Sequence, residues 1–580
     1  YTTPDKFLIR PTNAVETIVI DRISHDINGI SNSVDNEVQS ATGKLVHAIF
    51  GIVHLLAGPY LIVVTKASKV AQIFNSPIMR VDETELLSYC KTTWHLTNEQ
   101  VQHNNAYLAM IKTVLNTPHF YFSYSYDLSH TLQRLQNSGP DFLSASICDR
   151  ADTRFVWNRF LSNEFLHKVE LKRFCVPFIH GFIASESVTK FSFTIISRRS
   201  ATRAGTRMFS RGIDNEGNVS NFVETEQIIE YGNTRSSLVQ IRGSIPLFWT
   251  QLPNLYYKPA PMLSPLNNHA DALYKHIDNL ICHYGKVVLI NLVNHSGQEQ
   301  PLENEFKQNV LNLNNALVRY ESFDFHKECK KMRWDRLSIL MNRINQEQIE
   351  FGYFLSSDDT VLSTQDGVFR TNCIDSLDRT NVVQSLIAKK SLDDQLRKFN
   401  VLAHGESIDD HHHFADVYRN VWADNADMCS IQYAGTGALK TDFTRTGKRT
   451  KTGLVKDGLN SLIRYYKNNF ADGFRQACEN YPLKDGIDLF LGKYRPDENE
   501  GKLHPSPLTD KKDWKYLVLP TILLGSLAMF FFSIFIPTEH STETFMYLIF
   551  WSGMVSFSLA VIVYYGTEFV DFPKLCEVRR

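Results

Sequence analysis

A cysteine and an arginine stand six positions apart in a segment suited to holding phosphate. Residues 367–385 read GVFRTNCIDSLDRTNVVQS, in which Cys373 is followed by Arg379 and Thr380. The apolar lead-in predicts a strand before the cysteine, and the apolar run after Thr380 predicts a helix leading away. The five residues between would wrap around an anion, with backbone N–H groups and a helix N-terminus directed at it. This spacing favours attack of a thiolate on a phosphate ester.

Each residue of this segment has a predicted role. Cys373 would attack phosphorus in line and form a cysteinyl-phosphate that water then hydrolyses. Arg379 would grip two phosphate oxygens as a planar fork. Thr380 would hydrogen-bond the sulfur and stabilise it as a leaving group. The loop amides would hold the remaining oxygens, and they belong to Ile374, Asp375, Ser376, Leu377 and Asp378. The loop contains no glycine, so we expect its ligand-free shape to differ and to close on substrate.

The departing alcohol oxygen needs a proton, and two loop carboxyl groups are candidate general acids. Asp375 is our first candidate and Asp378 the second. The alternative is structural, because an aspartate in such a loop can cap the helix or orient Arg379 instead.

The same spacing occurs once more in the chain. Cys148 is followed six residues later by Arg154, but Phe155 then replaces the hydroxyl residue, and no strand, loop and helix pattern surrounds the pair. We therefore interpret Cys148 as a structural thiol.

Several segments resemble the Sac-domain phosphoinositide phosphatases. The string RTNCIDSLDRTNVVQS closely resembles the signature of that family. The likeness extends through SRRSATRAGTRMFSRGID (197–214), NFVETEQII (221–229), RGSIPLFWTQ (242–251) and YAGTGALKTDFTRTGKRT (433–450). Together with two apolar C-terminal runs, it is closest to the membrane-anchored members of the endoplasmic reticulum and Golgi.

The resemblance implies hydrolysis of phosphatidylinositol 4-phosphate, and also of the 3-phosphate, to phosphatidylinositol and phosphate. It implies no cofactor and no metal, and it makes membrane-contact-site or trafficking proteins candidate partners. Two departures stand out. Ser376 replaces a second cysteine common in the family, and the C-terminus lacks a lysine-based retrieval signal. The rival hypotheses are a catalytically weak phosphoinositide-binding membrane scaffold and a protein tyrosine phosphatase, which the missing glycines disfavour.

The overall pattern predicts an α/β protein of several units. The resemblance implies a mixed α/β Sac N-terminal domain (1–170) packed on an α/β, cysteine-phosphatase-like catalytic domain (171–480). Leu45–Thr65 predicts two paired buried strands with a turn at residues 57–59, and Val15–Asp21 a further strand. We expect Thr84–Val114 and Asp127–Gln136 to be more helical. In the second domain, Lys286–Val293 predicts a strand and Glu303–Glu321 a helix.

The C-terminus predicts a transmembrane hairpin. Residues 516–536 and 545–565 are uncharged runs of 21 residues, each about 31 Å long as a helix, which spans a bilayer. Lysines and arginines flank the pair, whereas the intervening 537–544 carries none, so the positive-inside rule makes this loop lumenal. The linker (481–515), the tail (566–580), both termini and the catalytic domain would then be cytosolic. Nine scattered cysteines without metal-site spacing agree with a reducing compartment, and we see no secretory leader.

The net charge is only −1, so attraction to an anionic partner must come from local clusters. Two runs qualify: five arginines between Arg198 and Arg211, and five basic residues between Lys440 and Lys451. We predict that they contact an anionic membrane surface and the lipid headgroup, with Arg207, Lys440 and Lys448 as headgroup contacts. Nucleic acid is excluded by the neutral charge and the hairpin. His411–His413 has metal-ligating side chains, but we favour an exposed polar loop.

Overall fold

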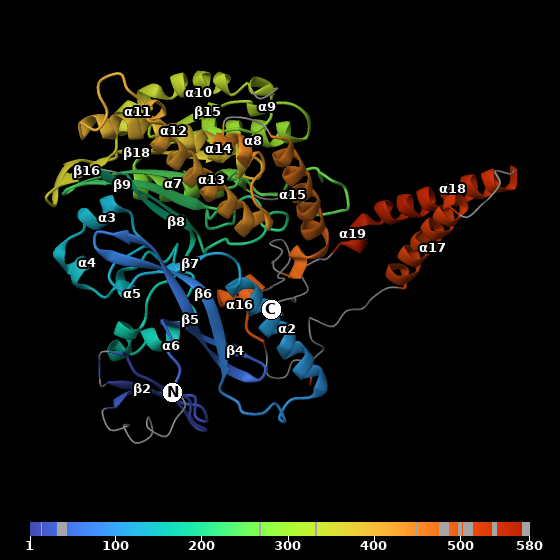
Figure 1. Cartoon of the computed structure of the whole chain (residues 1–580), viewed down its shortest axis with the longest axis horizontal. Helices are drawn as coiled ribbons and strands as arrows, with labels where there is room; N and C mark the ends of the chain where they lie inside the picture. The colour runs from blue at the N-terminus through green and yellow to red at the C-terminus, as the bar shows by residue number, and fades with distance from the viewer. Residues whose placement is uncertain are drawn as a thin grey trace.

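A computed structural model describes residues 1–12, 14, 16–31, 43–188, 190–265, 268–330, 333–446, 450–474, 486–496, 502, 514–535 and 542–570. Within these residues a single sheet of thirteen strands runs through the body of the molecule (Figure 1). Its order is β15 (Val318–Ser322), β14 (Lys286–Asn291), β18 (Gly367–Asn372), β11 (Thr234–Arg242), β10 (Val223–Tyr231), β9 (Phe191–Arg199), β8 (Ile179–Val188), β7 (Phe120–Phe122), β6 (Ser76–Ser88), β5 (Gly58–Ile73) and β4 (Ala48–Leu55), with β16 (Phe354–Ser357) on β11 and β17 (Thr360–Ser363) on β16. The predicted α/β class is confirmed.

The strands nearest Cys373 are parallel. β14 pairs in parallel with β15 and with β18, and β18 pairs in parallel with β11. Alternate residues of β14 enter different cores because successive side chains point to opposite faces of a strand. Val287 and Leu289 pack with α7 (His269–Tyr284) and α8 (Gln300–Leu313). Val288 and Ile290 pack with α10 (Leu337–Arg343) and α12 (Asp378–Lys398). Helices therefore cover both faces here.

The N-terminal part confirms the two predicted buried strands. β4 and β5 pair antiparallel through residues 48–64, and the turn reaches Gly58, whose φ of 102° disfavours side chains. The predicted strand near residue 15 is β2 (Thr17–Asp21), between β1 (Lys6–Ile9) and β3 (Ile27–Ser31) in a separate sheet. β7 pairs with β8 across the predicted domain boundary at residue 170, so both parts share one sheet. The boundary itself stays a prediction.

Two helical predictions are partly wrong. Residues 84–88 continue β6, and helix α2 begins later (Asn98–Leu115), while only α3 (Leu132–Gln136) forms within 127–136. The predicted helix over 303–321 ends with α8 at Leu313, after which Asn314 adopts a left-handed conformation (φ 44°) and the chain enters β15. In both places pairing with a neighbouring strand outweighs local helix propensity.

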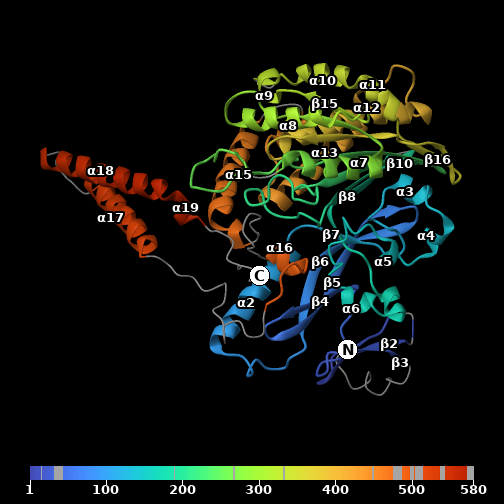
Figure 2. The ribbon, with the colours of Figure 1, turned by 180° about the vertical axis from the view of Figure 1, so that it is seen from behind.

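The C-terminal part contains two long apolar helices. α17 (Lys515–Phe535) and α18 (Thr542–Tyr564) pack side by side and project from the body (Figures 1 and 2). Residues 517–535 and 542–564 are long and apolar enough to cross a membrane. Part of the predicted linker is not a free tether, because Ile487, Leu489 and Phe490 of α16 (Gly486–Phe490) are buried against α2 and β4. Most of residues 495–515, residues 536–541 and the tail beyond 570 lie outside the described residues.

Candidate active site

Cys373 lies at the carboxyl end of β18, between β11 and β14, and the chain turns from it into α12. This is the predicted arrangement of strand, loop and helix. The Cys373 side chain is buried, and the Thr380 hydroxyl donates to its Sγ at 3.6 Å. α12 begins at Asp378, so its first amides face the loop with the positive end of the helix dipole. The strand end therefore places the Cys373 sulfur where an anion would bind.

Arg379 reaches back over the neighbouring strand end. Its Nη1 donates to the carbonyl of Leu292 at 3.0 Å, just beyond β14, and both Nη atoms lie 3.3 Å from the Glu299 carboxylate. Burial alone would lower the pKa of Arg379, but the charges of Cys373 and Glu299 raise it above its ordinary value. The arginine is thus a firm cation beside the sulfur, and its fork binds the Glu299 carboxylate.

The loop between Cys373 and Arg379 is fastened from behind. The carbonyl of Ile374 accepts from Arg211 Nη1 at 3.0 Å, and that of Leu377 accepts from Arg242 Nη2 at 2.9 Å. Asn221 donates to the Asp375 carbonyl at 3.4 Å. Ser376 completes the turn with φ at 50°, a conformation unusual outside glycine. Because these carbonyls bind groups behind the loop, the loop can present amides to an anion on the other side.

Asp375 is paired with two arginines. Its Oδ1 accepts from Arg207 Nε at 2.9 Å and from Arg211 Nη2 at 2.7 Å. Burial would raise the pKa of Asp375, but the two guanidinium groups outweigh burial and hold this pKa well below its usual range. A carboxyl group in this state does not carry a proton to donate.

Asp378 has a different environment. Its Oδ1 accepts from the backbone N–H of Leu439 at 2.9 Å, and Arg464 lies nearby. Burial raises the pKa of Asp378 above its ordinary value, and Arg464 and the N–H of Leu439 offset only part of that effect. Of the two candidate acids, Asp378 is the one whose surroundings favour the protonated form.

These residues line one cavity of about 630 Å³. Cys373, Ile374, Asp375, Leu377, Asp378 and Arg379 all line it, together with Arg207 and Lys440 from the basic runs. Ser376, at the centre of the loop, is fully buried, and Thr380 is buried against the Cys373 sulfur. Lys448 lies outside the described residues. The described lining carries six cations against three acids: Arg207, Lys258, Lys330, Arg379, Lys440 and Arg464 against Glu299, Asp375 and Asp378. The cavity therefore suits an anionic headgroup.

Four contributors escaped the sequence analysis: Arg211 as a partner of Asp375, Arg242 and Asn221 behind the loop, and Glu299 beside Arg379. Arg464, on α15 (Lys451–Phe470), is a fifth. All come from segments distant in sequence from residue 373. A signal existed for three of them: Arg211 belongs to the first basic run, and Asn221 and Arg242 begin two of the segments that resemble the Sac family.

The prediction that the first basic run contacts a membrane surface is wrong. Arg198 and Arg199 are buried, and Arg198 pairs with Glu224 at 3.0 Å and Glu226 at 2.7 Å on the adjacent strand β10. In the second run, Arg445 pairs with Asp424 and Asp427, whereas Lys451 is exposed. His411–His413 are exposed as predicted, and among the described residues no three His, Cys, Asp or Glu side chains gather as for a metal.

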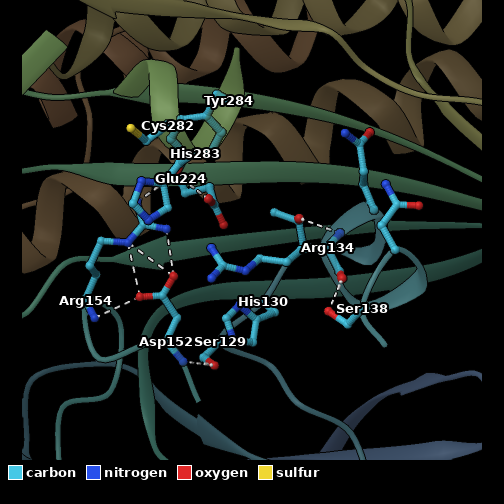
Figure 3. A pocket seen from close by; sticks show the side chains of 13 residues that line it. Ser129, His130, Arg134, Ser138, Asp152, Arg154, Glu224, Cys282, His283 and Tyr284 are labelled. Atoms are coloured by element: carbon cyan, nitrogen blue, oxygen red, sulfur yellow. Dashed lines mark hydrogen bonds and ion pairs between the residues drawn. The ribbon is translucent and has the colours of Figure 1, made fainter. Parts of the chain in front are cut away.

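A second, polar cavity contains the arginine of the other cysteine and arginine pair (Figure 3). Arg154 is bound by the Asp152 carboxylate, with Nη2 to Oδ2 at 2.7 Å, and lies over the Tyr284 ring. Cys148 does not line this cavity; its Sγ donates to the Cys175 carbonyl, and burial raises the pKa of Cys148 to about 12. The burial and the hydrogen bond of Cys148 agree with the prediction of a structural thiol, and Arg154 is held in an ion pair.

Comparison with known proteins gives a consistent result. A family model described as "SacI homology domain" matches residues 47–330. The "Phosphatidylinositol-3-phosphatase SAC1-A" of Danio rerio is 49% identical over 584 residues, covering 100% of this chain and 97% of the relative. The Drosophila melanogaster protein "Phosphatidylinositol-3-phosphatase SAC1" is 44% identical, covering 99% and 96%. The Saccharomyces cerevisiae protein of the same name is 37% identical, covering 93% and 87%.

Proposed function

Because this chain belongs to the Sac family of phosphoinositide phosphatases, we propose that it hydrolyses phosphatidylinositol 4-phosphate, and also the 3-phosphate, from a membrane anchor. The observation that carries the proposal is the placement of Cys373, Arg379 and Thr380 at one strand end, in a cavity with an excess of cations. Each of these two substrates offers a single phosphate dianion that the loop amides and the arginine fork would bind.

The mechanism proceeds in two displacements. The Cys373 thiolate attacks phosphorus while Arg379 and the loop amides hold the equatorial oxygens, and the bond to the inositol oxygen breaks. Asp378 donates a proton to that oxygen as it leaves. The resulting Asp378 carboxylate takes a proton from water, which attacks phosphorus and releases phosphate. The Thr380 hydroxyl, 3.6 Å from the sulfur, stabilises the thiolate as it departs.

We assign Asp375 a positioning role. Its carboxylate holds Arg207 and Arg211, and Arg211 in turn holds the loop carbonyl of Ile374. Arg207 and Lys440 would contact the headgroup from the cavity wall, and Lys448 belongs to the same proposal from its position in the sequence.

The two apolar helices support a membrane anchor in which α17 and α18 span the bilayer twice. The basic flanks support an orientation with the catalytic part and both ends of the chain in the cytosol. The endoplasmic reticulum and Golgi are the locations that we propose, on the strength of the family resemblance.

A substrate panel tests the proposed function. The full chain, reconstituted in phosphatidylcholine vesicles containing one phosphoinositide at a time, is expected to release phosphate from phosphatidylinositol 4-phosphate and 3-phosphate. Malachite green detection of free phosphate is the measurement. Binding of the water-soluble dioctanoyl phosphoinositides without release of phosphate would favour the scaffold hypothesis and contradict the enzyme.

Replacing Asp378 by asparagine is expected to lower kcat/KM for phosphatidylinositol 4-phosphate by about 10² to 10⁴-fold. The acid must be protonated in the first step, so activity of the native chain falls as pH rises through the pKa of Asp378, which burial raises. The variant should lose this falling limb. It should also lose less activity on p-nitrophenyl phosphate, whose leaving group needs no proton.

Asp375→Asn is the contrasting variant. It breaks a buried ion pair, a change that costs about 3 to 5 kcal/mol of folding free energy, so its melting temperature should fall. Its remaining activity should keep the falling limb. If Asp378→Asn retains that limb and Asp375→Asn loses it, the two roles are reversed.

A further inference from the structure

The apolar side of helix α15 faces outward and its polar side faces the protein, which is the reverse of the usual arrangement. Its largest apolar side chains point away from the protein: Leu454, Val455, Leu459, Leu462, Ile463, Tyr466 and Phe470, with Leu462 69% exposed. A surface helix of a water-soluble domain normally buries this stripe. Seven such residues on one helix form a contiguous patch, which we call the α15 apolar face.

The polar side of the same helix faces the protein. Asp457 accepts from the backbone N–H of Lys440 at 3.1 Å, and Arg464 Nη2 donates to the Gly437 carbonyl at 3.0 Å. Tyr465 OH donates to the Leu255 carbonyl at 2.7 Å. These contacts fix the rotation of the helix about its axis, so the apolar face is held outward by hydrogen bonds.

The polar side also lines the catalytic cavity. Ser461, Arg464, Tyr465 and Asn468 contribute to its wall. Helix α15 therefore has one side at the catalytic cavity and the other side at the outer surface. A lipid substrate keeps its acyl chains in the bilayer while its headgroup enters the cavity, so this helix lies where headgroup and hydrocarbon meet.

The segment 254–255 links α15 to α19 (Gly566–Phe569), the short helix that follows the membrane-spanning pair. α19, which directly follows α18, packs on the 254–255 segment so closely that a Cβ on Gly566 would lie 2.3 Å from the Asn254 carbonyl oxygen. That segment is bound to α15, because the Leu255 N–H donates to Asn469 Oδ1 at 3.2 Å. Figures 1 and 2 both show the hairpin projecting from the side of the body that carries α15.

The charges on α15 match an anionic lipid surface. Lys451 and Lys456 are exposed along the helix, whereas Lys467 donates from Nζ to the Gly435 carbonyl at 2.6 Å. The one acid of the helix, Asp457, accepts from the backbone N–H of Lys440. Tyr256 and Tyr257, exposed on the adjoining segment, are side chains favoured at the membrane interface. An apolar stripe with lysines beside it is typical of helices that lie in the plane of that interface.

We propose that α15 lies in the headgroup region of the bilayer spanned by α17 and α18, and that its apolar face is covered by phospholipid. This inference rests on the proposed function. In this position α15 holds the mouth of the catalytic cavity at the depth of the substrate headgroup.

Photocrosslinking identifies the occupant directly. The full chain, with p-benzoylphenylalanine at position 462, is reconstituted in phosphatidylcholine and phosphatidylserine vesicles, irradiated and analysed by mass spectrometry. The control carries the same probe at position 349, an exposed apolar position on α11 (Asn345–Phe351). Phospholipid adducts at 462 and not at 349 are expected. Adducts to this chain, to a second copy, or no adducts at 462 would overturn the proposal.

A kinetic test measures how the contact between α15 and the membrane affects the rate of hydrolysis. The triple variant Leu459→Gln, Leu462→Gln, Tyr466→Gln removes apolar surface without touching the cavity. It should lower hydrolysis of long-chain phosphatidylinositol 4-phosphate in vesicles by about tenfold or more, and leave hydrolysis of the water-soluble dioctanoyl form unchanged. The matched control is Leu311→Gln, Ile349→Gln, Leu362→Gln, which removes exposed apolar residues elsewhere and should change neither rate.

The outcomes distinguish a failure of this proposal from a failure of the proposed function. An unchanged vesicle rate in the α15 variant, or an equal loss on both substrates, would refute the membrane contact. If the native chain hydrolyses neither substrate, the proposed function fails, but the crosslinking result still stands on its own.

Discussion

Replacing Cys373 by serine is expected to lower phosphate release from phosphatidylinositol 4-phosphate by about 10⁴-fold or more, because losing a nucleophile removes the covalent route altogether. Serine preserves the size of the side chain, but its hydroxyl is far less ionised than a thiol. Binding of the headgroup should persist, since Arg379 and the loop amides remain. Phosphate release in vesicles and equilibrium binding of the water-soluble dioctanoyl phosphatidylinositol 4-phosphate are the two measurements.

Cys148→Ser is the matched control, since Cys148 has the same six-residue separation from an arginine. Its thiol is buried and donates to the Cys175 carbonyl, a bond that a serine hydroxyl can also make. Activity should stay within about twofold of the native chain. A variant at position 373 that turns over normally, or a large loss at position 148, would contradict the assignment of the nucleophile.

Arg379→Lys is expected to lower kcat by about 10² to 10³-fold while preserving the positive charge. A lysine cannot reproduce the planar fork that binds two phosphate oxygens in the transition state. The variant Arg397→Lys, on the same helix, changes an arginine that pairs with Asp394 at the surface and should leave kcat unchanged.

Steady-state kinetics and a melting curve separate chemistry from folding in this comparison. The Arg379 side chain also binds Glu299, so a loss of stability is measured independently. Retention of kcat within threefold in Arg379→Lys would show that the fork is not needed.

Local sequence patterns predicted the parts of the fold that depend on local sequence. The paired strands in residues 45–65, the strand β14 and the two C-terminal apolar helices all follow from hydrophobic period and length. Residues 84–88 and 318–321 are helical in the sequence prediction, yet the first pairs with β5, the preceding strand, and the second with β14. Such pairings are tertiary and leave no mark in a single segment.

Prediction of the candidate site is limited in the same way by contacts between distant segments. The strand, loop and helix around Cys373 were predicted, but the roles of Asp375 and Asp378 depend on which cations face each carboxylate. Arg207 and Arg211 reach Asp375 from more than 160 residues away. Likewise, Arg198 has no acidic residue near it in the sequence, so its ion pair could not be predicted. The register of β9 and β10 places Glu224 directly opposite it.

Three buried groups behind the phosphate loop have a consequence for turnover. Arg211, Asn221 and Arg242 tie down the carbonyls of Ile374, Asp375 and Leu377 from separate parts of the chain. Ordering a flexible loop around each incoming anion would reduce affinity by the entropy lost. Here the loop carbonyls are bound when the polypeptide folds, so this entropy is not lost again with each lipid molecule. These contacts argue against the expectation, drawn from the missing glycines, that the loop closes on substrate.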